Sequence, residues 1–181
     1  MASKVDNLLM AFEKVISQKW VGTVSGRERI WFLIYDPNEQ RKISLRIDDF
    51  ETATKKAGKR WIKISVKKCF PDWMSNHEYH REYFSDPSSI VDQLETEFKD
   101  YVCDFLTNAI VEAKIDDNTL IVLEDVGSLF GLVRFSDILN NINTSLKGRL
   151  LVFFPGEFDK NNYRLLSARD GWNYLARPIT L

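Results

Sequence analysis

The sequence predicts an α/β protein in which helices cover both faces of a mostly parallel sheet of about four or five strands. Apolar runs at 30–35, 120–123 and 150–154 are typical of strands buried on both faces. Segments with helical spacing of apolar residues alternate with these runs, and such alternation favours parallel strands joined by right-handed crossovers. No repeat, low-complexity tract or linker divides residues 1–181, so we expect one three-layer domain.

The composition limits the class of protein. The chain has 181 residues, 44% of them hydrophobic, and a formal net charge of −1. These values allow a sizeable core and argue against a polycation that coats nucleic acid. No apolar run reaches the roughly 18–20 residues of a membrane span, and the first residues lack the apolar core of an export signal. Because Cys69 and Cys103 are single and far apart, we expect reduced thiols in a cytoplasmic protein.

Local signals place the elements of the first third of the chain. A Ser-x-x-Asp capping pattern opens a helix over 3–16, and the run at 30–35 ends at Asp-Pro as a central strand. Helical spacing at 43–57 ends at Gly58, which suits a helix C-cap. Residues 61–66 alternate between apolar and polar, which predicts a half-exposed strand near the sheet edge.

The middle of the chain is less regular. Residues 67–85 read as an irregular aromatic segment that contains exposed loop histidines. Asp86 and Pro87 then open the longest helix, as N-cap and first-turn proline, and its period continues to about residue 114. A third buried strand at 120–123 precedes a helix over 135–148.

The final segment begins with five large apolar residues at 150–154 that stop at Pro155-Gly156. We expect a central strand that ends there in a turn. Charged and aromatic residues are interleaved after it, a mixture typical of binding loops. Residues 174–179 form a possible fifth strand, which Pro178 would place at an edge.

Carboxylates at strand ends raise two enzymatic alternatives. Residues 120–125 resemble the Walker B half of a nucleotide-hydrolysing fold, but no GxxxxGK[ST] loop accompanies them, so we expect a Rossmann-like or degenerate P-loop-like fold without a phosphate-binding loop. Asp36, Glu124 and Asp125 with Lys67 could serve a metal-dependent nuclease, although their spacing is unspecific. His77 and His80 do not form an HExxH pattern. We predict no metal, no cofactor and no catalytic residue.

One stretch of the sequence is strongly basic, with no acidic residue from 52 to 71. It could contact nucleic-acid phosphates or an acidic partner, or it could be the solvated face of an edge strand. Its seven cations are Lys55, Lys56, Lys59, Arg60, Lys63, Lys67 and Lys68.

Several stretches together resemble the BrxB proteins of BREX (bacteriophage exclusion) defence systems. They lie at 83–87, 126–134, 148–157, 163–166 and 170–175. The resemblance implies a small cytoplasmic component of a multi-gene antiphage system that includes a DNA adenine methyltransferase, a large ATPase and the phosphatase-superfamily protein PglZ. It implies no catalytic residues, since no catalytic activity is established for the family.

These observations predict a non-enzymatic adaptor that binds other BREX proteins, mainly the PglZ-type protein, and meets DNA only weakly or indirectly. A cryptic metal-dependent nuclease or a degenerate nucleotide-binding module is the alternative. The partner surface is expected on the loops after the third and fourth strands, where arginines and aromatics gather. Its predicted residues are Phe130, Arg134, Glu157, Phe158, Tyr163, Arg164, Arg169 and Trp172. Alternatively, Tyr163 and Trp172 pack the last segment onto the sheet.

Overall fold

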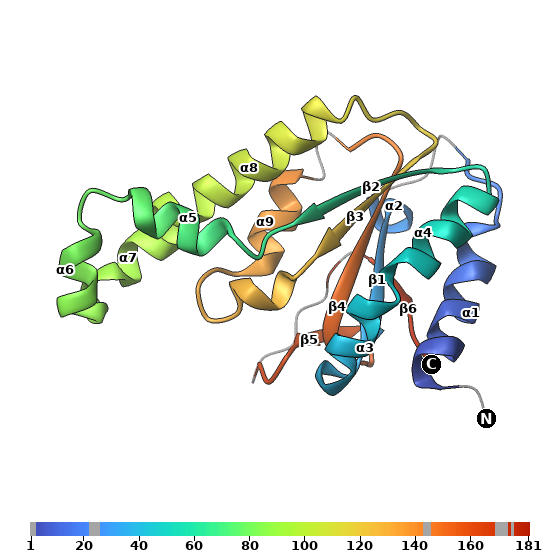
Figure 1. Cartoon of the computed structure of the whole chain (residues 1–181), viewed down its shortest axis with the longest axis horizontal. Helices are drawn as coiled ribbons and strands as arrows, with labels where there is room; N and C mark the ends of the chain where they lie inside the picture. Colours follow the sequence, from blue (N-terminus) through green and yellow to red (C-terminus); the bar gives the residue numbers. More distant parts are fainter. Residues whose placement is uncertain (1–2, 22–25, 143–145, 169–173, 175) are drawn as a thin grey trace.

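Helices lie on both faces of a six-stranded sheet, which confirms the predicted α/β class (Figure 1). The structure is a computed structural model that describes residues 3–21, 26–142, 146–168, 174 and 176–181. Five strands run parallel in the order β2, β3, β4, β1, β6, and β5 pairs antiparallel with the end of β4. The strands are β1 (Ile30–Tyr35), β2 (Arg60–Ser65), β3 (Thr119–Glu124), β4 (Arg149–Asp159), β5 (Asn162–Leu165) and β6 (Arg177–Ile179). As predicted, β2 and the proline-bearing β6 lie at the two edges.

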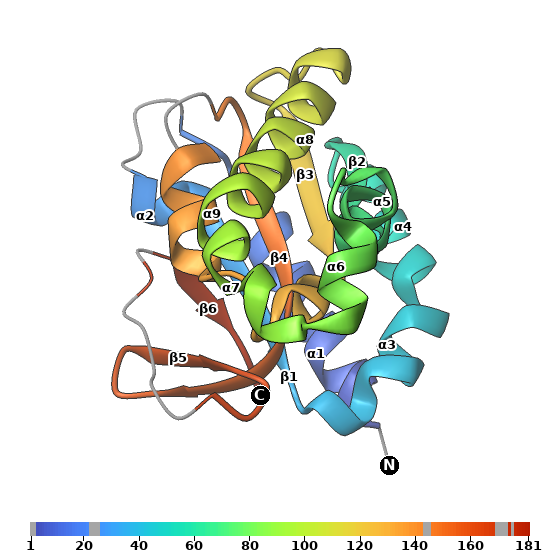
Figure 2. The same ribbon diagram turned by 90° about the vertical axis from the view of Figure 1, so that its left-hand side faces the viewer.

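Alternate side chains of each central strand enter two separate cores. On β1, Trp31 and Leu33 face one core, and Phe32 and Ile34 face the other. The first core lies under α1 (Lys4–Ile16), α3 (Gln40–Leu45) and α4 (Ile47–Lys56). The second lies under α8 (Lys99–Glu112) and α9 (Phe135–Ile142), which stand in front of β3 and β4 in Figure 2. Because both faces are covered, the central strands read as continuous apolar runs.

Three capping residues lie where the sequence predicts the start or end of a helical segment. The Ser3 hydroxyl accepts a hydrogen bond from the Asp6 backbone N–H, and the Asp6 carboxylate accepts one from Ser3 N–H, which completes a capping box. Asp86 accepts from the Ser88 backbone N–H at 3.1 Å and starts the next helical segment. Gly58 follows α4 with a positive φ of 72°.

Two predicted helices are interrupted. The helix expected over 43–57 is divided at Arg46, which forms ion pairs with Asp6 and Asp49. The helix expected over 86–114 passes through η2 (Pro87–Ile90), α7 (Val91–Gln93) and a π-helical turn, η3 (Leu94–Phe98), before α8. The helix expected over 135–148 is α9 over Phe135–Ile142, and residues 146–148 are not helical; residues 143–145 lie outside the described residues.

The prediction of an irregular segment at 67–85 is wrong, because its aromatic residues fold into α5 (Cys69–Asn76) and α6 (His80–Ser85). Trp73 and Tyr83 are buried in the second core. The histidines are not exposed either. The His77 side chain is 11% exposed and its Nε2 lies 2.9 Å from a Glu97 carboxylate oxygen. None of the described helices is long and apolar enough to cross a membrane.

The prediction of a turn at Pro155-Gly156 is also wrong, because both residues lie within β4. Pro155 pairs in register with Tyr35 of β1, and β4 continues to Asp159 before a tight turn at residues 160–161, where φ is 47° and 69°. Beyond Pro155 the strand exchanges its parallel neighbours for the antiparallel partner β5. A side chain at Gly156 would overlap the Arg164 carbonyl, so this glycine is needed for close strand approach and not for a turn.

Candidate partner-binding surface at the carboxyl edge of the sheet

The loop after β3 and the hairpin after β4 lie together, as the sequence predicts from neighbouring strands. Asp125, with a positive φ of 63°, leads into the 3₁₀ turn η4 (Val126–Leu129). At Gly127 this turn lies so close to the hairpin that a Cβ would be 3.4 Å from the Pro155 ring and 3.6 Å from Leu166. Leu166 N–H in turn donates to the Pro155 carbonyl at 2.8 Å. The two segments form one continuous surface, the carboxyl-edge surface.

Phe130 and Arg134 lie at a hollow in this surface. Phe130 is 40% exposed, although it is a large aromatic side chain. The hollow has a volume of about 260 Å³. One of its walls is Glu95 of the π-helical turn, a residue that no sequence pattern assigned to this surface. The lining consists of Glu95, Phe130, Gly131, Val133, Arg134, Phe135, Leu165, Ala168 and Tyr174.

The hairpin contributes an exposed charged pair. Glu157 and Arg164 are directly opposite each other on β4 and β5, and both are exposed. Phe158 is half-buried, and its ring centroid lies 4.6 Å from that of Tyr163. Opposite charges at facing positions of an antiparallel pair stabilise the hairpin modestly and leave polar groups available at its surface.

Tyr163 does not belong to the accessible part of the surface. It is only 2% exposed, and its hydroxyl donates to the Ala176 carbonyl at 2.8 Å. Its ring packs edge-on against Phe32 in the core. Tyr163 therefore attaches the hairpin to the segment before β6, as in the packing alternative considered above. Arg169 and Trp172 lie outside the described residues.

The carboxylates at this edge have internal partners. Glu124 lies 3.7 Å from Lys63, and Asp125 accepts a 2.6 Å hydrogen bond from the Ser65 hydroxyl. Burial raises the pKa of Glu124, against the opposing effect of Lys63. Asp36 accepts from the Asn38 backbone N–H at 2.9 Å and so caps the turn after β1. Within the described part of the chain, no group of three or more His, Cys, Asp or Glu side chains could hold a metal ion.

The basic stretch is distributed along the whole length of β2. Lys55 and Lys56 end α4, Lys63 lies in mid-strand, and Lys67 and Lys68 follow the strand. Several of its members have partners within the chain. Lys55 pairs with Glu51 and Lys63 with Glu124.

At the start of β2, Lys59 donates to the Asn118 side chain at 2.8 Å, and Arg60 lies 3.7 Å from Asp116. Lys59 also lies over the Trp20 ring, 4.6 Å from its centroid. The seven cations thus do not converge on one patch.

Residues 63–178 match the family model described as BREX protein BrxB. This segment runs from β2 to β6 and contains the whole carboxyl-edge surface, whereas α1, β1, α3 and α4 precede it. No curated protein and no solved structure matches the chain. Since the family match covers more than half of the sequence, the chain belongs to the BrxB family and is a component of a BREX defence system.

Proposed function

We propose that the protein is a non-enzymatic adaptor that binds other BREX proteins through its carboxyl-edge surface, with the PglZ-type protein as its main partner. DNA would be reached weakly or through the assembled complex. The observation that carries this proposal is the exposed Phe130 ring at the hollow that it shares with Arg134. Aromatic and arginine side chains next to a hollow are the types that dominate binding energy at protein interfaces.

The backbone around Phe130 is held by local hydrogen bonds. Phe130 N–H donates to the Gly127 carbonyl at 3.1 Å, and the Ser128 hydroxyl donates to the Asp125 carbonyl at 2.7 Å. Leu132 N–H continues the turn by donating to Leu129 at 3.0 Å. A loop that is already ordered loses little conformational entropy on binding, so these bonds favour a surface ready for a partner.

The carboxylates on which the nuclease alternative depends serve the fold itself. Glu124 pairs with Lys63, Asp125 accepts from Ser65, and Asp36 caps a turn. The sequence also lacks the glycine-rich loop that nucleotide hydrolysis needs. We therefore expect the purified protein to show no metal-dependent DNA cleavage and no ATP turnover. Cleavage that is abolished by Asp125→Ala or Glu124→Ala would replace the adaptor proposal with the nuclease alternative.

The partner surface is tested by co-purification from cells that carry the complete BREX operon. A triple variant, Phe130→Asp, Arg134→Glu and Arg164→Glu, removes the aromatic side chain and reverses both charges. A matched control, Met10→Asp, Lys14→Glu and Arg41→Glu, makes the same kinds of change at exposed positions outside the family-matched segment. We expect the triple variant to lose the PglZ-type protein and the control to retain it.

Stability measurements make the result interpretable. Changes at exposed side chains usually alter the free energy of unfolding by no more than about 0.5 kcal/mol, so both variants should keep a thermal midpoint close to that of wild type. If the triple variant is folded and still retains every partner, the interface lies elsewhere on the molecule. If it is unfolded, the co-purification is repeated with the single variant Phe130→Asp. This variant should fold, because the Phe130 side chain is already 40% exposed.

A further inference from the structure

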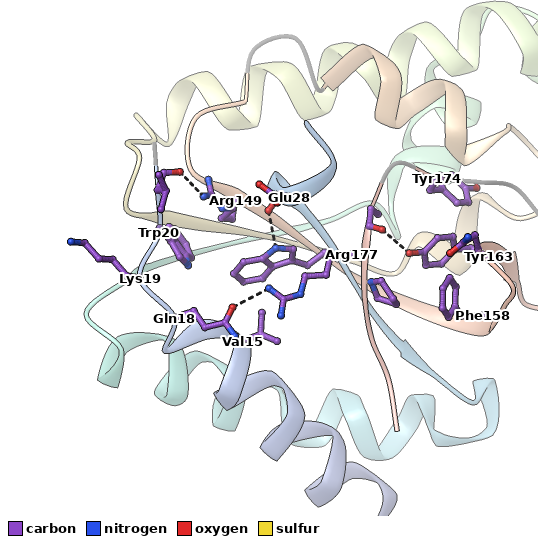
Figure 3. Close-up of a pocket in the computed structure, with 15 residues that line it drawn as sticks. Val15, Gln18, Lys19, Trp20, Glu28, Arg149, Phe158, Tyr163, Tyr174 and Arg177 are labelled. Carbon is purple, nitrogen blue, oxygen red and sulfur yellow. Dashed lines mark hydrogen bonds between the residues drawn. The ribbon is translucent and has the colours of Figure 1, made fainter. Parts of the chain in front are cut away.

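A groove runs beside the edge strand β6 and has a volume of about 550 Å³. One of its lining residues, Tyr174, also lines the carboxyl-edge hollow. Figure 3 shows Trp20, Glu28 and Arg149 at one end, Phe158, Tyr163 and Tyr174 at the other, and Arg177 between them. Its walls come from the end of α1, the start of β1, the start of β4 and the β4–β5 hairpin. The groove thus joins parts of the chain that are far apart in sequence.

Arg149, the first residue of β4, is a buried cation at one end of the groove. It is 5% exposed, and its guanidinium donates to the carbonyls of Gly148 at 3.0 Å and Val21 at 3.1 Å. It forms no ion pair with any carboxylate among the described residues. Burial, together with the charge of Arg29, lowers the pKa of Arg149, against the opposing charges of Glu28 and Asp117. A buried cation without a direct ion pair is unfavourable, and an anionic ligand would supply one.

The remainder of the groove has an excess of positive charge. Arg177 is exposed and donates to the neutral Gln18 side chain at 3.0 Å, and Lys19, another exposed cation, also lines the groove. Glu28 is the only Asp or Glu among the described lining residues. Elsewhere in the structure an arginine does form an ion pair with a carboxylate, as Arg46 does with Asp49 at 2.7 Å. The cations of the groove are therefore available to a ligand that carries more than one negative charge.

Two indole rings form the wall next to Arg149. The Trp20 and Trp31 rings meet edge to face at 5.7 Å, and the Arg149 guanidinium lies 5.2 Å from the Trp20 centroid. Trp31 Nε1 donates to the Glu28 carbonyl at 3.0 Å, which fixes its ring. The buried Trp20 Nε1 has no acceptor among the described residues. Aromatic surfaces next to arginines are the usual means of binding bases and phosphates together.

The groove is poorly suited to an added peptide strand. β6 is an edge strand, but Pro178 at its centre has no N–H to donate to an incoming backbone. A strand-addition partner would therefore lose a main-chain hydrogen bond there. This argues against an acidic peptide and for a compact anion with a ring attached.

We propose that this groove binds a nucleotide phosphate, with the phosphate at Arg149 and the base against the aromatic wall. The nucleotide could be free or could be the 5′-phosphorylated end of a nucleic-acid strand, because both present the same chemistry. Arg177 and Lys19 add positive charge at the rim. The phosphate end of this site lies at Arg149, at the start of β4, and only the far end of the groove shares the β4–β5 hairpin with the carboxyl-edge surface. The proposal does not depend on the adaptor proposal.

Isothermal titration of the full-length protein tests the proposal. The probes are adenosine 5′-monophosphate, adenosine, inorganic phosphate, and a short single-stranded oligonucleotide with a 5′-phosphate or a 5′-hydroxyl. We expect a phosphorylated probe to bind and its unphosphorylated counterpart not to bind. Binding of the mononucleotide identifies a free nucleotide as ligand, and binding of the 5′-phosphorylated oligonucleotide alone identifies a strand end.

Charge variants locate the binding site. Arg149→Gln should weaken the bound probe about 10- to 100-fold, as expected for loss of a hydrogen bond to a charged group. Arg177→Glu should weaken it about tenfold, with a reduced dependence on salt. Arg164→Glu and Arg41→Glu, at exposed arginines outside the groove, serve as controls and should leave affinity unchanged.

Three results would overturn the proposal: no phosphorylated probe binds, binding survives both groove substitutions, or an acidic peptide binds the groove as tightly as the phosphorylated probe. If Arg149→Gln does not fold, binding to Arg177→Glu tests the proposal, because the Arg177 side chain is exposed and makes only one described hydrogen bond, to Gln18.

Discussion

The two edges of the parallel sheet differ in the charged residues that begin or end their strands and in the partners of those residues. At the carboxyl edge, acids lie at or just after the ends of β1, β3 and β4, and two of them have partners within the chain, Glu124 in Lys63 and Asp125 in Ser65. At the amino edge, β2, β4 and β6 each begin with an arginine, and Arg149 and Arg177 meet neutral oxygens instead of carboxylates. Since parallel strands all start at one edge, residues that share a position in their strands are gathered there. The formal net charge of −1 does not reveal this uneven distribution of charged residues between the two edges.

The hollow and the groove occupy different positions along the sheet. In open α/β sheets the carboxyl edge is the usual ligand site, and it is where the sequence directs attention. Here that edge offers an aromatic and charged surface suited to a protein partner, whereas the cationic groove lies beside β6 and reaches the amino edge. Charged side chains that form ion pairs within the chain stabilise the fold. Charged side chains without an ion pair are the candidates for binding a charged ligand.

The largest expected effect concerns the amino edge. Gly148 precedes Arg149 with a φ of 72°, and a Cβ there would overlap the carbonyl oxygens of Thr119 and Asp116. Gly148→Ala should therefore lower the free energy of unfolding by about 3 kcal/mol or more, measured by urea denaturation. Gly58 has the same φ but no atom near its missing Cβ, so Gly58→Ala should cost only about 1–2 kcal/mol. Equal losses would show that the amino edge yields to the added methyl group.

The next largest effect concerns the hydrogen bond that attaches the β4–β5 hairpin to the segment before β6. Tyr163→Phe removes the hydroxyl that donates to Ala176 and leaves a buried carbonyl without that donor. It should lower the free energy of unfolding by about 1–2 kcal/mol, measured by the same urea titration. Tyr79→Phe is the matched control, since Tyr79 is 49% exposed, and should change stability little. A loss as small as that of the control would mean that the hairpin does not depend on this bond.

The smallest effect is a dependence on pH at Glu124. Burial raises its pKa in the folded protein, so the folded state holds its proton more tightly than the unfolded state does. The stability contributed by Glu124 must then fall as pH rises from the unfolded value through the folded pKa. Glu124→Gln should gain stability relative to wild type between pH 4.5 and neutral pH, measured as urea midpoints at several pH values. The exposed Glu157→Gln is the control, and a stability difference for Glu124→Gln that does not vary with pH would contradict the prediction.

Local signals in the sequence account for much of the fold. The apolar run of β1 predicts a strand buried on both faces, and the alternation of β2 predicts an edge strand, because side-chain period reports burial directly. Capping residues such as Ser3 act within a few positions of themselves, so the helix starts are also predicted. The adjacency of β3 and β4, and with it the carboxyl-edge surface, follows from the same reasoning.

Three features could not be predicted correctly from local sequence patterns, because contacts between distant parts of the chain determine them. Pro155-Gly156 has the composition of a turn, yet the approach of the Arg164 backbone keeps it within a strand. Tyr163 has the surroundings of a surface residue, but the hairpin folds it onto Phe32. The segment at 67–85 becomes helical because a core is present for its aromatics to enter.

By itself, then, the sequence determined the α/β class, the buried strands, the helix starts at Ser3 and Asp86 and the family of the protein, because these depend on periodicity, caps and local motifs. Only the tertiary structure decided which distant residues meet. Trp20 and Arg149 come from opposite ends of the chain, and they form one wall of the groove because β4 pairs with β1 and begins beside it. The pairing of distant strands is set by the packing of whole strands and helices. No local pattern around Arg149 therefore predicts that its side chain is buried and bonded to carbonyls instead of a carboxylate.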